Sequence, residues 1–231
     1  MLLTSAGVKN PSIHSALVAM LGRPTAECSA LAITTASYGH PYSGPGPAYS
    51  FISGVGSETP MVELGWKEVG LLELTALPSI EPEKWMSWVR ETDVLLVNGG
   101  DALYLAHWMR ESGLAVLLPE LDDLVWVGLS AGSMVLTPRV GSDFIEWTPP
   151  GTDGAVDDIT LGVVDFAIFP HLDYPGWDEN TMAAAESWAA QIGMPSYAID
   201  DQTALSVVDG VVEVVSEGHW RKFDSPISLV E

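Results

Sequence analysis

The sequence predicts an α/β protein with a mostly parallel central sheet. The 231 residues are enough for one domain with a sizeable core, and 47% of them are hydrophobic. Short apolar or β-branched runs alternate with longer helical patterns, which is typical of βαβ units. We expect strands at residues 2–4, 30–35, 70–74, 94–97, 125–129, 166–169, 196–199, 204–208 and 211–215. We expect helices at residues 12–21, 81–91, 102–112 and 178–192.

Turn residues support these boundaries. Asp209-Gly210 separates the last two strands and predicts a two-residue antiparallel hairpin. Pro82 falls in the first turn of one helix, and Gly113 lies just past the end of another, where these residues are favoured. Residues 38–57 and 148–154 are rich in Gly, Pro or Thr and are interpreted as long loops, the first a candidate lid. Neither repeats nor a linker interrupt the pattern, so we predict one domain over residues 1–231.

The composition excludes several classes of function. Nine Lys and Arg residues stand against 31 Asp and Glu residues, a formal net charge of −22, so nucleic acids and anionic membranes are not expected partners. Cys28 is the single cysteine, and no metal-binding spacing of His and Cys is present, so we predict neither a disulfide nor a metal. No signal peptide or long apolar segment is recognisable, and a cytoplasmic protein is expected.

The clearest chemical motif is Gly128-Leu129-Ser130-Ala131-Gly132, which follows an apolar strand and precedes a helical pattern. In this context G-x-S-x-G predicts a nucleophile elbow, in which glycines permit a sharp turn that exposes the serine hydroxyl. The backbone N–H of Ala131 would then face a developing oxyanion. A glycine-rich turn without chemical function is the alternative interpretation.

A serine nucleophile needs a base, and the sequence offers five histidines. His171 is the candidate because it follows the strand at 166–169 and so lies at a strand's carboxyl end, where open α/β sheets bind ligands. His14 and His107 fall within expected helices, His40 within a loop, and His219 within the terminal tail. His171 therefore predicts a Ser–His pair with Ser130.

The orienting acid is expected at a third strand end, where Asp200 and Asp201 follow the strand at 196–199. The order Ser, His, Asp differs from the Ser, Asp, His order of α/β-hydrolases, which argues against an ordinary lipase or esterase. After the strand at 94–97, Gly99 and Gly100 would bring a backbone N–H to an oxyanion hole. A phosphate site is disfavoured there because Asp101 would repel phosphate.

Four motifs in order resemble those of peptidase family S51, which includes the α-aspartyl dipeptidases (peptidase E) and the cyanophycinases. They cover roughly residues 93–208, and the earlier residues match in their βα pattern alone. The motifs are Asn98-Gly99-Gly100-Asp101, Gly128-Leu129-Ser130-Ala131-Gly132, Phe169-Pro170-His171 and Ile199-Asp200-Asp201.

The resemblance implies a three-layer α/β sandwich similar to class I glutamine amidotransferase domains. By position, Ser130 corresponds to the nucleophile and His171 to the base. Gly100 and Ala131 correspond to the donors of the oxyanion hole.

The acid of the triad departs from the dipeptidase pattern. The glutamate of that family falls on Asp201, whose shorter side chain leaves Asp200 and Asp143 as alternatives. Asp101 stands where peptidase E has asparagine, and it matches the cyanophycinases instead.

The implied function is a serine peptidase that hydrolyses small peptides through an acyl-enzyme, without a cofactor, as a monomer or homodimer. A cyanophycinase-like hydrolase of an acidic polymer and a non-enzymatic ligand-binding domain on the same fold are the alternatives. Peptidase E reads its substrate's carboxylate with an arginine shortly after the histidine, whereas residues 176–182 here carry no cation. Asp178 and Glu179 would repel a carboxylate, so strict Asp specificity is not expected unless Arg110 or Arg139 reaches the site.

Overall fold

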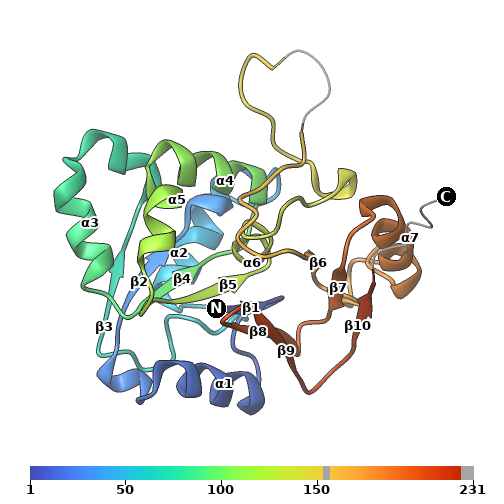
Figure 1. The fold of residues 1–231 in the computed structure, drawn as a ribbon, viewed down its shortest axis with the longest axis horizontal. Coiled ribbons are helices and arrows are strands. Elements are labelled where there is room, and N and C mark those ends of the chain that lie inside the picture. Colours follow the sequence, from blue (N-terminus) through green and yellow to red (C-terminus); the bar gives the residue numbers. More distant parts are fainter. Residues whose placement is uncertain (153–156, 225–231) are drawn as a thin grey trace.

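The computed structural model describes residues 1–152 and 157–224 and centres on a seven-stranded sheet (Figure 1). The strand order is β3-β2-β4-β5-β1-β8-β9, with the first five strands mutually parallel and the last two antiparallel to their neighbours. These strands are β1 (Leu2–Thr4), β2 (Ser29–Ile33), β3 (Glu68–Leu71), β4 (Val94–Val97), β5 (Val125–Leu129), β8 (Thr203–Val208) and β9 (Val211–Ser216).

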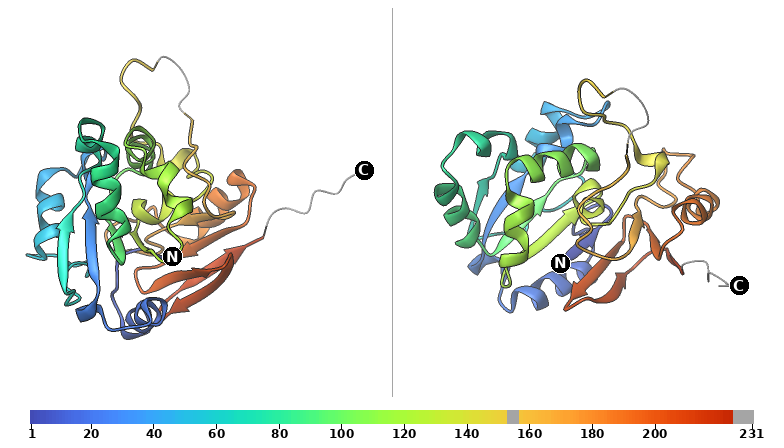
Figure 2. Two further views of the ribbon diagram at one scale, coloured as in Figure 1. Left: turned by 60° about the vertical axis from the view of Figure 1, so that its left-hand side comes forward. Right: turned by 45° about the horizontal axis from the view of Figure 1, so that its top comes forward.

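Helices cover both faces of this sheet, which gives three layers (Figure 2). Residues of β4 point alternately to the two faces: Val94 and Leu96 pack with α1 and α2, and Leu95 and Val97 pack with α3, α4, α5 and α6. All four β4 side chains are fully buried, as expected for a parallel strand between helical layers. The helices are α1 (Pro11–Leu21), α2 (Pro45–Ser53), α3 (Pro82–Arg90), α4 (Ala102–Glu111), α5 (Leu114–Leu117), α6 (Ala131–Met134) and α7 (Met182–Ile192). The predicted fold class is confirmed.

A second, three-stranded sheet lies beside the first, in the order β10-β7-β6. It consists of β6 (Ala167–Phe169), β7 (Ser196–Ile199) and β10 (Trp220–Phe223). Ile168 and Ile199 join the core that also packs against the main sheet, and Phe169 and Ala198 pack against α7. The expectation of one central sheet was therefore incomplete, because the apolar pattern of a strand does not specify its partner.

The structure differs from the sequence prediction in several segments: β10 and α5 were not predicted, and two expected segments have other bounds or another structure. Residues 38–57 were expected to form a loop, but they contain helix α2. Gly44 and Gly54, with φ of 130° and 69°, cap this helix at its two ends. Helix α7 begins at Met182 instead of residue 178, because Thr181 caps it by accepting a hydrogen bond from the Ala184 N–H. Of the loop expected at 148–154, residues 153 and 154 lie outside the described residues.

The predicted hairpin is confirmed. Asp209 and Gly210 both have positive φ, 50° and 75°, and join the antiparallel strands β8 and β9. In the described part of the chain, no helix is long and apolar enough to cross a membrane.

Candidate active site

The predicted site residues gather at the carboxyl ends of the parallel strands. Ser130 follows β5, the Gly99-Gly100 turn follows β4, and His171 follows β6. Gly99, Gly100, Ser130 and His171 line one cleft of about 1110 Å³, to which α2 and the segments 56–59 and 176–180 also contribute. This is the edge at which open α/β sheets bind ligands.

Ser130 occupies a strained turn between β5 and α6. Its backbone has φ of 49° and ψ of −112°, a conformation that costs a non-glycine residue roughly 1–3 kcal/mol and is found at functional sites. A Cβ on Gly128 would lie 2.4 Å from the Gly132 carbonyl oxygen, and one on Gly132 would lie 2.2 Å from the Val97 carbonyl oxygen. Both glycines are therefore required by close backbone packing, which supports the interpretation of this segment as a nucleophile elbow.

His171 and Asp201 form a short contact at the ends of β6 and β7. The distance from His171 Nδ1 to Asp201 Oδ1 is 2.7 Å, and both side chains are mostly buried. His171 itself has a positive φ of 55°. A carboxylate at Nδ1 favours the tautomer with its proton on that nitrogen, which leaves the Nε2 lone pair free to accept a proton.

The surroundings of Asp201 stabilise its ionised form. Burial opposes ionisation, but the hydrogen bond and charge of His171, the charge of Lys9 and a hydrogen bond from Ser5 outweigh it. The pKa of Asp201 is consequently lowered from its ordinary value.

The two alternative acids have other contacts. Asp200 accepts hydrogen bonds from the Gln202 N–H at 3.0 Å, the Thr203 hydroxyl at 2.6 Å and the His219 N–H at 2.5 Å. It thus joins the turn after β7 to the start of β10. Asp143 lines the cleft and accepts a hydrogen bond from the Ser142 hydroxyl at 3.0 Å. Among the described residues, neither carboxylate contacts the His171 ring.

The turn after β4 lies against the nucleophile. A Cβ on Gly99 would lie 3.3 Å from Ser130 Cβ, and one on Gly100, where φ is 138°, would lie 2.2 Å from the Ala36 carbonyl oxygen. Within the described residues, the backbone N–H groups of Gly100 and Ala131 donate to no protein acceptor. These two groups are therefore available to an oxyanion beside Ser130.

Asp101 caps the N-terminus of α4. Its Oδ1 accepts a hydrogen bond from the Tyr104 N–H at 2.7 Å, while Oδ2 is buried without a hydrogen-bond partner among the described residues. Burial raises the pKa of this carboxyl, and the nearby charge of Glu146 adds to the increase, although neighbouring amides oppose it. Glu146 in turn pairs with His40 Nε2 at 2.8 Å.

The cleft is strongly acidic. Six carboxylates and no Lys or Arg are among its described lining residues: Glu58, Asp101, Asp143, Glu146, Asp178 and Glu179. The two arginines considered from the sequence are placed elsewhere, since Arg139 pairs with Asp158 at 2.8 Å and Arg110 donates to the Thr160 carbonyl at 2.7 Å. Neither of them lines the cleft.

Sequence reasoning missed several cleft residues. His40 and Glu146 were not assigned to the site, and neither was Trp177, whose ring centroid lies 4.9 Å from that of His171. Ser5 does not line the cleft but contacts both His171 and Asp201 from a fully buried position, and it was also missed. Ser5 follows β1 directly, so the strand-end rule that identified His171 also applied to it.

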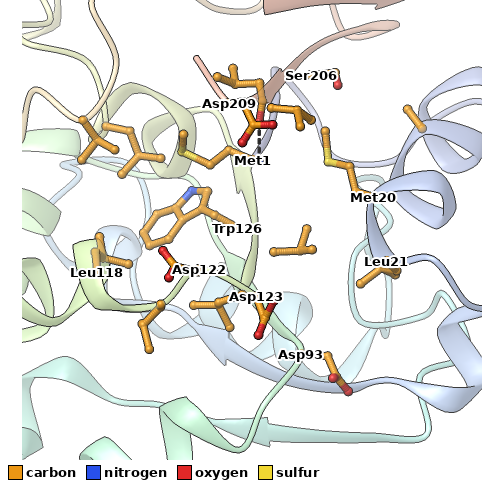
Figure 3. Close-up of a pocket in the computed structure, with 18 of the residues that line it drawn as sticks. Met1, Met20, Leu21, Asp93, Leu118, Asp122, Asp123, Trp126, Ser206 and Asp209 are labelled. Atoms are coloured by element: carbon orange, nitrogen blue, oxygen red, sulfur yellow. Dashed lines mark hydrogen bonds between the residues drawn. The ribbon is translucent and has the colours of Figure 1, made fainter. Parts of the chain in front are cut away.

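A second cavity of about 1310 Å³ lies at the amino ends of the parallel strands of the main sheet (Figure 3). Met1, Met20 and Trp126 contribute apolar surface, and Asp122 and Asp209 are among the other residues that line it. Its lining, as far as the described residues form it, includes neither a histidine nor any of the predicted site residues. The smaller cleft, which holds Ser130 and His171, is therefore the candidate active site.

Comparisons with known proteins agree with this architecture. Two solved structures share the fold: a protein assigned as peptidase E from Listeria monocytogenes EGD-e, with 18% identity and a TM-score of 0.65, and a peptidase from an acI-B1 Actinobacterium, with 17% identity and a TM-score of 0.66. The first comparison covers 94% of this chain and 98% of the other, and the second covers 97% and 93%. No curated protein matches the chain significantly. The model of peptidase family S51 matches residues 60–215, which is more than half of the sequence. The chain belongs to peptidase family S51 and is a serine-type peptidase.

Proposed function

We propose that Ser130, His171 and Asp201 are a catalytic triad that hydrolyses small peptides, in the manner of a dipeptidase, through an acyl-enzyme. The observation that carries this proposal is the 2.7 Å contact between His171 Nδ1 and Asp201 Oδ1 in the same site as Ser130. The strained backbone of Ser130 adds support, because such strain is typical of an exposed nucleophile.

The reaction proceeds in two acyl-transfer steps. His171 Nε2 takes the proton of the Ser130 hydroxyl as Oγ attacks the peptide carbonyl, and the N–H groups of Gly100 and Ala131 stabilise the oxyanion. The C–N bond then breaks, and the imidazolium gives its proton to the leaving amine. A water molecule then attacks the acyl-enzyme carbonyl as His171 takes its proton. When the bond to Ser130 Oγ breaks, the imidazolium returns the proton to Oγ, which releases the carboxylic acid and the free serine. Asp201 stays ionised and stabilises the imidazolium in both steps.

The charge of the cleft argues against strict selection of N-terminal aspartate. A substrate carboxylate would meet Asp178, Glu179 and four further carboxylates with no Lys or Arg along the described lining. Transfer of an unpaired charge into such surroundings is unfavourable by several kcal/mol. Peptides with neutral or basic residues should therefore be preferred, and the carboxylates suit a substrate α-amino group.

A fluorophosphonate probe tests the nucleophile without knowledge of the substrate. Labelling should occur at Ser130 and disappear in Ser130→Ala, whereas Ser15→Ala, an exposed change in α1, should label normally. Absence of labelling, under conditions where a known serine peptidase reacts, would favour a ligand-binding domain.

Substrate profiling tests the specificity. The kcat/KM values for Asp-, Ala-, Leu- and Lys-containing dipeptides and anilides should be compared in one buffer, with a β-linked acidic polymer as a further substrate. A preference for Asp above roughly tenfold, about 1.4 kcal/mol in the transition state, would contradict the specificity argument. Cleavage of the polymer alone would favour the cyanophycinase-like alternative.

A further inference from the structure

Ser5 links the two sheets at the centre of the candidate site. It follows β1 of the main sheet and is fully buried. Its Oγ accepts a hydrogen bond from the His171 backbone N–H at 2.6 Å and donates one to Asp201 Oδ1 at 3.2 Å. The same Oδ1 atom contacts His171 Nδ1, so the three residues form a closed ring of hydrogen bonds.

This ring of hydrogen bonds stabilises both the backbone conformation of His171 and the tautomer of its imidazole. The backbone of His171 has φ of 55°, which an L-residue adopts at a cost, and the Ser5 hydroxyl holds its N–H in place. A hydroxyl that accepts from this N–H directs its own proton toward Asp201, which keeps Oδ1 an acceptor for Nδ1–H. Ser5 thereby favours the tautomer in which Nε2 is unprotonated.

The residue before Ser5 connects the ring to the nucleophile. The Thr4 carbonyl accepts hydrogen bonds from the Ser130 N–H at 3.0 Å and the Ser133 hydroxyl at 2.8 Å. Two consecutive residues at the end of β1 thus contact the nucleophile turn on one side and the His171–Asp201 pair on the other. Because Thr4 and Ser5 are adjacent in the chain, they hold the Ser130 turn of the main sheet close to the His171–Asp201 pair of the second sheet.

We propose that Ser5 is a positioning residue of the catalytic apparatus, which holds the backbone and tautomer of His171 through its hydroxyl group. The inference rests on the proposed function of Ser130 and His171. It requires the hydroxyl itself, and a side chain that merely fills the same space should not replace it.

A pair of variants with the same shape isolates the hydroxyl. Ser5→Thr keeps the hydroxyl and adds one methyl group, and Ser5→Val has a methyl group in place of that hydroxyl, so the two variants have nearly the same shape at this buried position. The readouts are the rate of fluorophosphonate labelling at Ser130 and the midpoint of thermal unfolding. Ser196→Ala serves as a control, because Ser196 is equally buried but its Oγ has no hydrogen-bond partner among the described residues.

We expect Ser5→Val to be labelled at least tenfold more slowly than Ser5→Thr, and Ser5→Ala at least tenfold more slowly than wild type. Ser196→Ala should be labelled at the wild-type rate. Equal labelling within either pair would overturn the inference while leaving the proposed function intact. Lower thermal stability with a normal labelling rate would likewise reduce Ser5 to a structural residue. Absence of Ser130 labelling in wild type would refute the proposed function and, with it, this inference.

Discussion

Replacement of Asp201 by asparagine separates the acid of the triad from its neighbour Asp200. The change preserves shape but removes the charge from the atom 2.7 Å from His171 Nδ1. A hydrogen bond to a charged group contributes about 1.5–3 kcal/mol, which corresponds to a loss of about 10- to 150-fold in rate. If the amide turns its NH₂ group toward Nδ1, the wrong tautomer is stabilised and the loss approaches about 10⁴-fold.

Asp200→Asn is the matched control. Asp200 accepts three hydrogen bonds within the turn and at the start of β10, and an amide can retain the two at Oδ1. Loss of the third, from the His219 N–H, should cost about 1–3 kcal/mol in unfolding free energy. For a chain of this size, each kcal/mol lowers the melting temperature by roughly 2–4 °C. The rate of the folded enzyme should remain near that of wild type.

Two assays distinguish the variants, fluorophosphonate labelling of Ser130 and urea unfolding. Both changes should lower the free energy of unfolding, but Asp201→Asn alone should also slow the labelling. A larger rate loss in Asp200→Asn would refute the assignment of Asp201. Because the pKa of Asp201 is lowered in the folded state, its ionisation stabilises the protein above the ordinary carboxyl pKa. This contribution disappears as the pH falls through the folded pKa, and the pH dependence should weaken in Asp201→Asn.

Three further predictions concern the cleft. Ser130→Ala and His171→Ala should each reduce kcat by several orders of magnitude with little further loss in the double variant, and additive losses would contradict a joint role. Asp101→Asn should keep the helix cap and raise the free energy of unfolding at pH 7. The reason is that burial raises the pKa of Asp101, so its ionisation opposes folding at higher pH. Chemical unfolding at pH 7 and pH 4 should show a smaller gain at pH 4, and an equal gain at both would contradict this explanation. Gly132→Ala should lose several kcal/mol in urea unfolding, because its Cβ would lie 2.2 Å from the Val97 carbonyl oxygen, and a stable variant would show that the elbow can rearrange.

Local sequence signals predicted much of the site because its residues follow strands. Ser130, His171 and Asp201 each stand directly after an apolar run or within two residues of one, and the topology brings the ends of these strands together. Glycines marked the close backbone contacts at Gly100 and Gly132, where any side chain would collide with a carbonyl. The strand-end rule thus located Ser130 and His171, and it left Asp200 and Asp201 as two candidate acids.

Other features depend on partners far away in the sequence. Strand β6 has the same apolar character as the central strands, yet it pairs with β7 in a separate sheet. The local sequence around Ser5 gives no sign of its contacts, because His171 and Asp201 lie 166 and 196 residues away in the sequence and only the fold brings them beside it. Helix α2 was missed because its terminal glycines and prolines also match the composition of a loop.

The register of the second sheet and the backbone of His171 together explain why the imidazole meets Asp201 and not Asp200. Strands β6 and β7 are adjacent and parallel, and Phe169 pairs with Ala198, so continuation of the register would place His171 beside Asp200. The chain instead turns at His171, with φ of 55°, and the Leu172 N–H bonds to the Ile199 carbonyl at 3.1 Å. This turn brings the imidazole against Asp201, one residue beyond that register. The positive φ of His171 thus accompanies the pairing with Asp201, and the hydrogen bond from its N–H to Ser5 holds the turn in place.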